Sequence, residues 1–183
     1  MCYVFKSTMN RPIFLIGMPG VGKTTIGRKL AVALQKHFLD LDEYIEEKHR
    51  QPVQQIFALN GEAFFREAEA VALREISTRA NGAVVATGGG TPCFLDNIDY
   101  MNEVGVTIYI KVPETALVER LTRTNREQRP LLAGKTADEI KQFVTVTLTS
   151  RLQFYQKAQI TYQNASRDIS ELKRLIQAME NIC

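Results

Sequence analysis

Cysteine is scarce in this sequence, with three residues among 183. Cys2, Cys93 and Cys183 lie far apart and form no C-x-x-C pair, which excludes a zinc ribbon or a disulfide framework and predicts reduced thiols in a cytoplasmic protein. Long hydrophobic runs are absent too. None approaches the roughly 20 residues of a membrane span, so we expect no membrane partner. Residues 1–10 lack the apolar core of a signal peptide and are expected to form a loose extension.

Neither sign of charge predominates, because 23 Lys and Arg residues nearly balance 20 Asp and Glu residues and leave a net charge of +3. This mild excess gives no case for nucleic acid as a partner. Apolar residues make up an ordinary 45% of the chain, and residues 11–183 suffice for a single domain with its own core. The sequence contains no long exposed apolar stripe of the kind that would indicate a stable dimer. We therefore expect a monomer.

The clearest motif is GMPGVGKT at residues 17–24, which matches the phosphate-binding pattern G-x-x-x-x-G-K-T. An apolar run precedes it and a helical pattern follows it, as this loop requires. Its glycines let several backbone N–H groups point at a phosphate chain, and the following helix adds the positive end of its dipole. Lys23 would supply a cation for the β- and γ-phosphates, and the Thr24 hydroxyl would bind Mg²⁺.

Apolar segments alternate with helical segments along the whole chain. This alternation predicts an α/β fold with a parallel sheet, helices on both faces, and ligands at the carboxyl ends of the strands. The range 144–149 alternates like a strand inside an expected helix. The expected strands cover residues 12–16, 38–42, 83–87, 106–110 and 160–162, and the expected helices cover 24–35, 43–50, 52–59, 62–78, 113–122, 136–157 and 169–179.

Asp40 and Asp42 stand at the carboxyl end of the second expected strand. Two residues apart on a strand, their side chains would point the same way. One carboxylate could then orient Mg²⁺ and its waters, and the other could hold or deprotonate an acceptor hydroxyl. The alternative is a solvated pair that caps the helix beginning at Glu43.

Arg66 and Glu69 lie three residues apart on one face of an expected helix. They could form a surface ion pair of little energetic value. Nearby Phe57, Phe64 and Phe65 favour a different interpretation, because an arginine among aromatic rings can bind a small carboxylate at two points. Glu69 would then orient the guanidinium.

Gly88, Gly89 and Gly90 follow a buried strand directly. Without side chains they would let a ligand approach the backbone, although a flexible turn is the simpler alternative. No acidic residue follows this strand, so a metal role would fall to Asp40.

Residues 125–136 are polar and contain the sequence Arg129-Pro130-Leu131-Leu132. A lid arginine here could stabilise charge on a transferring phosphoryl group. A solvated basic face is the alternative, and the lack of interleaved aromatic residues argues against RNA binding. The basic residues around this loop are Arg120, Arg123, Arg126, Arg129 and Lys135.

Taken in order, these motifs resemble those of shikimate kinases over residues 11–179. The set also includes Arg151 ahead of Tyr155. The resemblance implies Mg-dependent transfer of the ATP γ-phosphoryl group to the 3-hydroxyl of shikimate, giving shikimate 3-phosphate and ADP on the pathway to chorismate and aromatic amino acids. It further implies a P-loop NTPase fold with five parallel strands in the order 2-3-1-4-5, a shikimate-binding region near residues 42–78 and a mobile lid near 123–136.

The resemblance also implies a role for each matched residue. Lys23, Asp42 and Arg129 would be catalytic, with Arg129 as the lid arginine. Thr24 and Asp40 would hold one Mg²⁺, Asp40 through a water. The expected ATP-binding residues are Gly20, Val21, Gly22, Lys23, Thr24, Thr25 and Arg129. The expected shikimate-binding residues are Asp42, Phe57, Phe65, Arg66, Gly88, Gly89, Gly90 and Arg151.

Three rival functions stay open at this point. A gluconate kinase would share the loop and the lid, but gluconate has no ring to pack between Phe57 and Phe65. A nucleoside-monophosphate kinase would need a pocket for an acceptor base. A nucleotide-dependent switch would have no use for a second anion site. Adenine contacts are expected around Arg123 and residues 164–168, where the sequence lacks the expected proline.

Overall fold

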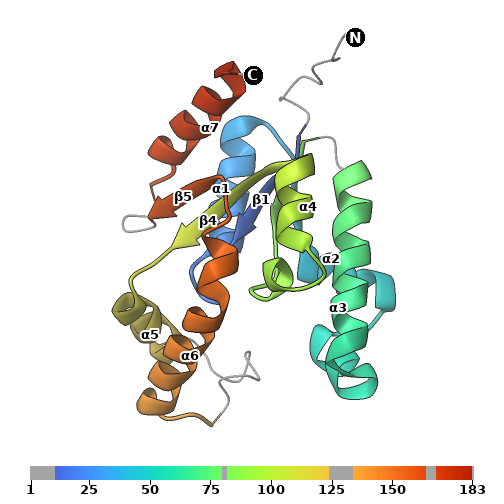
Figure 1. Ribbon diagram of the computed structural model, residues 1–183, viewed down its shortest axis with the longest axis vertical. Helices are drawn as coiled ribbons and strands as arrows, with labels where there is room; N and C mark the ends of the chain where they lie inside the picture. The colour runs from blue at the N-terminus through green and yellow to red at the C-terminus, as the bar shows by residue number, and fades with distance from the viewer. Residues whose placement is uncertain (1–10, 80–81, 124–133, 164–167, 183) are drawn as a thin grey trace.

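The computed structural model describes residues 11–79, 82–123, 134–163 and 168–182. Within these ranges five strands form one parallel sheet in the order β2-β3-β1-β4-β5 (Figure 1). The predicted fold class and strand order are therefore confirmed. The strands are β1 (Ile13–Ile16), β2 (Phe38–Asp40), β3 (Val84–Ala86), β4 (Val106–Lys111) and β5 (Ile160–Gln163).

The central strand β1 fixes where the ligand-facing edge lies. It pairs with β3 on one side and β4 on the other, and every residue of β1 and β3 is buried. A strand that is covered on both faces explains these uninterrupted apolar runs. In register, Leu15 pairs with Ala86, and Ala86 pairs with Asp40. The loops that follow β1 and β3, and the start of α2 after β2, therefore lie at one edge of the sheet.

Helices cover both faces of the sheet (Figure 1). On one face α1 packs against the strands and against α7, while α4 lies against β4 on the other face. The helices are α1 (Lys23–Leu34), α2 (Leu41–His49), α3 (Val53–Arg79), α4 (Asn97–Val104), α5 (Glu114–Arg123), α6 (Ala137–Tyr155) and α7 (Ser170–Ile182), with a 3₁₀ turn, η2, at Thr91–Cys93. None of the described helices is long and apolar enough to cross a membrane.

Two local features differ from the expectations, the end of the second strand and the segment after the third. The second strand ends at Asp40, and Leu41 already begins α2 because the Asp40 side chain caps that helix by accepting from the Asp42 N–H. The expected helix over residues 136–157 is confirmed as α6, which includes the strand-like range 144–149 and begins with a capping box formed by Thr136 and Glu139. Helix α4 and the turn η2 were not predicted, because eight residues give little periodicity to detect.

The predicted break at Gly61 is present. The two expected helices follow one another as the two halves of α3, and Gly61 between them adopts the non-helical angles φ 80° and ψ 174°. This non-helical glycine redirects the chain before Glu62, so that the segment from Glu62 onward carries Arg66 and Glu69 toward the sheet edge.

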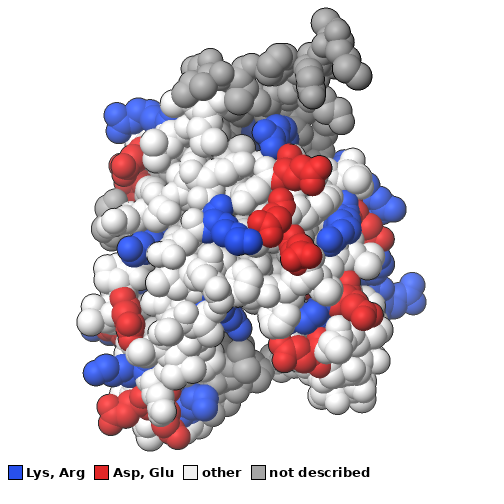
Figure 2. Space-filling view, viewed as in Figure 1, with Lys and Arg blue, Asp and Glu red and all other residues white. Residues whose placement is uncertain are grey.

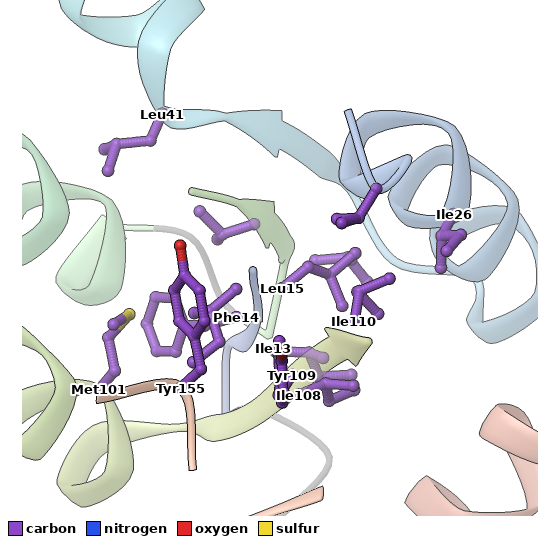
Figure 3. Packing of buried hydrophobic residues seen from close by; sticks show 14 of the residues in the cluster. Ile13, Phe14, Leu15, Ile26, Leu41, Met101, Ile108, Tyr109, Ile110 and Tyr155 are labelled. Atoms are coloured by element: carbon purple, nitrogen blue, oxygen red, sulfur yellow. The ribbon is translucent and has the colours of Figure 1, made fainter. Parts of the chain in front are cut away.

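The core lies between the sheet and these helices and brings β1, β4 and α6 into contact (Figure 3). Tyr109 and Tyr155 are buried in it, and their rings stack with centroids 5.1 Å apart. Tyr155, the last residue of α6, thereby anchors the end of this helix in the core.

Candidate active site

A cavity of about 820 Å³ lies at the carboxyl edge of the sheet. It is lined by the loops after β1 and β3, by the end of β2, and by residues of α1, α2, α3, α5 and α6. On the face in Figure 2, the surface is notched between the lobe of α5 and α6 and the lobe of α3. The predicted site residues that line the cavity are Gly20, Gly22, Lys23, Thr24, Thr25, Asp40, Asp42, Phe57, Phe65, Arg66, Gly88, Gly89, Gly90 and Arg151.

The phosphate-binding loop has the backbone that its glycines predict. Gly20 and Gly22 adopt φ 88° and 98°, in the region that residues with a side chain rarely enter. Gly22 is also the N-cap of α1, so the first N–H groups of this helix have no capping side chain from that position and can point at an anion. The ammonium of Lys23 donates to the carbonyls of Gly17 (2.8 Å) and Met18 (3.1 Å), which holds it over the loop.

Asp40 links this loop to α2. Its Oδ2 accepts a hydrogen bond from the Thr24 hydroxyl (3.0 Å), and its Oδ1 accepts one from the Asp42 N–H (3.1 Å). The prediction that Asp40 and Asp42 share a strand is therefore wrong, because Asp40 caps α2 and Asp42 lies in its first turn. Capping and ligand binding are not exclusive here, since both residues still face the cavity.

The Thr24 hydroxyl and the Asp40 carboxylate form a donor set that suits Mg²⁺. This ion prefers oxygen ligands and usually completes its shell with waters and substrate phosphates. Among the described residues, no group of three or more His, Cys, Asp or Glu side chains could hold a metal alone. A Mg²⁺ ion at Thr24 and Asp40 would consequently need the oxygens of a bound nucleotide.

Asp42 lies in an acidic surrounding. Burial, followed by the charges of Asp40 and Glu69, raises the pKa of Asp42 to about 7, and the nearby Lys23 opposes this shift. Asp42 Oδ1 also faces the glycine turn, since a methyl carbon at Gly88 would lie 3.1 Å from it. A carboxyl with this pKa can hold or accept a proton at neutral pH.

Arg66 is held from several sides, which rules out a simple surface ion pair. Its Nη1 donates to Glu69 Oε2 at 2.9 Å, and the Glu69 side chain is only 1% exposed. Glu62 accepts from the Nε and Nη2 atoms at 3.2 and 3.0 Å. The guanidinium carbon lies 4.2 Å from the ring centroid of Phe94, closer than to those of Phe57 and Phe65. Glu69 also accepts a hydrogen bond from the Thr91 hydroxyl.

The glycine turn passes between two arginines. A methyl carbon at Gly90 would lie 2.8 Å from both terminal nitrogens of Arg66, and one at Gly89 would lie 3.2 Å from Nη1 of Arg151. The Gly89 position would also meet Pro19 of the phosphate-binding loop at 2.8 Å. Close packing against Pro19 therefore requires glycine at position 89, whereas at position 90 a side chain would displace the end of Arg66, and the turn forms a floor between the two cations.

Two comparisons with known proteins identify the family. The family model for shikimate kinase matches residues 19–180. A shikimate kinase from Phocaeicola vulgatus is 45% identical over 166 residues, covering 91% of this chain and 92% of that protein. This chain belongs to the shikimate kinase family. As a member of the shikimate kinases it is an ATP-dependent kinase.

Solved structures of shikimate kinases are also similar to this chain. The crystal structure of the enzyme from Bacteroides thetaiotaomicron has a TM-score of 0.83 and 39% sequence identity, covering 94% of this chain and 97% of that one. The enzyme from Acinetobacter baumannii, solved in complex with shikimate, has a TM-score of 0.77 and 31% identity, covering 96% and 93%.

Two residues expected of a shikimate kinase site are not part of the described cavity lining. Arg129 falls outside the described residues, as do most of the expected lid and residues 164–167. Val21 is described, but its side chain is buried and its carbonyl accepts a hydrogen bond from Arg120 at 3.4 Å.

Several residues around this shikimate kinase site were missed from the sequence. Thr87 stands directly before the glycine turn, and its position at the end of a strand could have revealed it. Phe94 and Thr91 reach Arg66 and Glu69 only because η2 folds back onto α3. Val53 and Phe143 line the cavity from α3 and α6, and no local pattern distinguishes them from core residues.

Proposed function

We propose that this kinase transfers the γ-phosphoryl group of ATP to the 3-hydroxyl of shikimate with the help of one Mg²⁺ ion, giving shikimate 3-phosphate and ADP in the biosynthesis of chorismate and the aromatic amino acids. One observation carries the proposal. A second anion site, made by Arg66 and Arg151 around the glycine turn, shares a cavity with the phosphate-binding loop. An enzyme that joins a phosphate donor to a carboxylate-bearing acceptor needs this pair of sites.

The carboxylate of shikimate would lie between the guanidinium groups of Arg66 and Arg151. Their planar forks can each donate two hydrogen bonds to a carboxylate. Glu69 and Glu62 already hold Arg66 in place, so little side-chain entropy is lost when the acceptor binds. Phe57 and Phe65, whose ring centroids are 4.3 Å apart, offer an apolar wall for the ring.

The ring hydroxyls would meet Asp42, which lines the cavity beside Gly88. We expect this carboxylate mainly to orient the acceptor hydroxyl, because phosphoryl transfer has a loose transition state in which positioning dominates. Its raised pKa also allows it to receive the proton that leaves the 3-hydroxyl oxygen.

The phosphates of ATP would occupy the loop over residues 17–24. The N–H groups at the start of α1 and the ammonium of Lys23 would neutralise the β- and γ-phosphate oxygens. Thr24 and Asp40 would hold Mg²⁺, which when bound neutralises charge between these phosphates. We propose Arg129 as a further cation for the transferred group, on the basis of its position in the sequence alone.

The deciding experiment is a coupled assay of ADP release from ATP and Mg²⁺, with and without shikimate. We expect a large shikimate-dependent rate that disappears when EDTA removes the metal. Gluconate and nucleoside monophosphates are the matched alternative acceptors. If one of them is phosphorylated in preference to shikimate while ATP binding is intact, the kinase assignment stands and the proposed acceptor is wrong.

A further inference from the structure

Tyr155 lies beneath the acceptor site without lining the cavity. Its side chain is fully buried, and Figure 3 shows its ring beside Phe14, with the hydroxyl pointing away from Met101. The ring stacks on Tyr109 with an angle of 25° between their planes. Packing alone therefore fixes the direction in which the hydroxyl points.

The hydroxyl is bonded to a residue of the proposed acceptor site, because it donates to the carbonyl oxygen of Gly89 at 2.7 Å. Arg151 lies one helical turn earlier on α6 and approaches the same glycine, since a methyl carbon at Gly89 would be 3.2 Å from its Nη1 atom. The charge of Arg151 also acts on the Tyr155 hydroxyl. Burial raises the pKa of Tyr155, so the hydroxyl keeps its proton and remains a donor.

The contact with Gly89 orients a whole peptide group. In a trans peptide the C=O and the N–H point in opposite directions, so a fixed Gly89 carbonyl also fixes the N–H of Gly90. Within the described part of the chain, this N–H has no protein acceptor. Gly89 and Gly90 line the cavity between Arg66 and Arg151, where an anionic ligand can accept from such a group.

We propose that Tyr155 is a positioning residue for the acceptor carboxylate, and that its hydroxyl locks the Arg151 guanidinium and the Gly89–Gly90 peptide in one arrangement. This inference rests on the proposed function. Tyr155 itself touches no ligand. A phenylalanine would fill the same space in the core but would leave the Gly89 carbonyl without its donor and the nearby Arg151 guanidinium without the hydroxyl.

The test is the Tyr155→Phe variant, assayed with shikimate and with ATP as the varied substrate. Loss of the hydrogen bond that prealigns the site should raise the KM for shikimate about 5- to 30-fold. The KM for ATP should change less than about twofold, because the hydrogen bond of the hydroxyl that the described residues make is with Gly89 and not with the phosphate-binding loop. Shikimate should also raise the Tm of the variant less than it raises that of the parent protein.

Tyr109→Phe is the matched control, because it removes a hydroxyl from the other ring of the same stacked pair. It should leave both KM values unchanged. A variant with 4-aminophenylalanine at position 155 restores an N–H donor and should return the KM for shikimate toward the parent value. It also carries the test if Tyr155→Phe does not fold.

Two outcomes would overturn the inference. In the first, Tyr155→Phe lowers the Tm but leaves the KM for shikimate unchanged, or raises both KM values equally, which is the signature of a purely structural residue. In the second, the amino variant folds but keeps a raised KM for shikimate. A parent protein without any shikimate-dependent activity would instead contradict the proposed function, and that result is seen before any variant is compared.

Discussion

At the scale of single residues, the charged carboxylate of Asp42 lowers the stability of the fold, and the same carboxylate is proposed to orient the acceptor hydroxyl. Its carboxyl lies near Asp40 and Glu69, and only Lys23 among its main neighbours favours the charged form. A carboxyl held in such a place is typical of functional sites, where binding geometry has priority over stability.

The first prediction concerns the activity of Asp42→Asn. The amide keeps the size of the side chain but cannot accept a proton and orients a hydroxyl less strongly. We expect kcat/KM for shikimate to fall by about 100-fold or more, with ATP affinity nearly unchanged. Steady-state kinetics and nucleotide titration measure the two quantities. Unchanged shikimate kinetics would contradict the role of Asp42.

The second prediction concerns the stability of the same variant without ligands. The pKa of an ordinary aspartate carboxyl is 3.8, and that of Asp42 in the folded protein is about 7. The folded state therefore binds this proton more tightly than the unfolded state does. This carboxyl therefore destabilises the fold progressively as the pH rises between these values. We expect Asp42→Asn to raise the free energy of unfolding at pH 8 by roughly 1–3 kcal/mol, and by much less near pH 4. Urea unfolding at both pH values tests the sign, and a gain that is larger at the lower pH would refute it.

The third prediction concerns Phe94, whose ring covers the Arg66 guanidinium and is 36% exposed. Phe94→Leu should raise the KM for shikimate about 2- to 5-fold, the usual value of a cation–π contact, with little change in Tm. Phe64→Leu is the control, because Phe64 is similarly exposed but contacts His49. Equal effects of the two variants would show that the contact with Arg66 has no functional weight.

At the scale of elements, local patterns predicted what local interactions decide. The phosphate-binding loop, the buried strands β1 and β3 and the break at Gly61 all follow from neighbouring residues. The boundary between β2 and α2 did not, because alternation in residues 38–42 suits a strand while the side chain of Asp40 caps a helix.

The sequence predicted which residues line the cavity better than it predicted the contacts between them. Arg66, Asp42 and the glycine turn could be named from the sequence, but the stacking of Phe94 on Arg66 depends on the unpredicted turn η2. The bond from Tyr155 to Gly89 joins residues 66 positions apart. Such pairs are set by how elements pack, which a single sequence does not reveal.

The fourth prediction tests the packing of the glycine turn against α3. Gly90 has φ −91° and ψ −20°, which alanine adopts without strain, so Gly90→Ala should fold with little loss of stability. Its methyl group would meet Arg66 at 2.8 Å and displace the guanidinium. We expect kcat/KM for shikimate to fall by about 10- to 100-fold with ATP affinity retained. A fully active Gly90→Ala enzyme would mean that Arg66 does not need its present position.

At the scale of the whole molecule, the surface offers no evident place for a stable partner among the described residues. The exposed large apolar side chains are spread over separate elements, for example Val32 on α1, Val71 on α3 and Val146 on α6. Basic and acidic side chains alternate over the face in Figure 2. As the fifth prediction, size-exclusion chromatography with light scattering should give the mass of one chain, 20.7 kDa. A mass of two chains or more would contradict it.

The stacked pair of Tyr109 and Tyr155 has a consequence for how this protein tolerates sequence drift. The same ring that fills the core ends in a hydroxyl bonded to the glycine turn. A small shift in core packing, such as a change at Met101 or Phe14, would move that hydroxyl and alter substrate affinity before it unfolded the chain. We therefore expect fewer substitutions to be tolerated in this part of the core than in other equally buried parts.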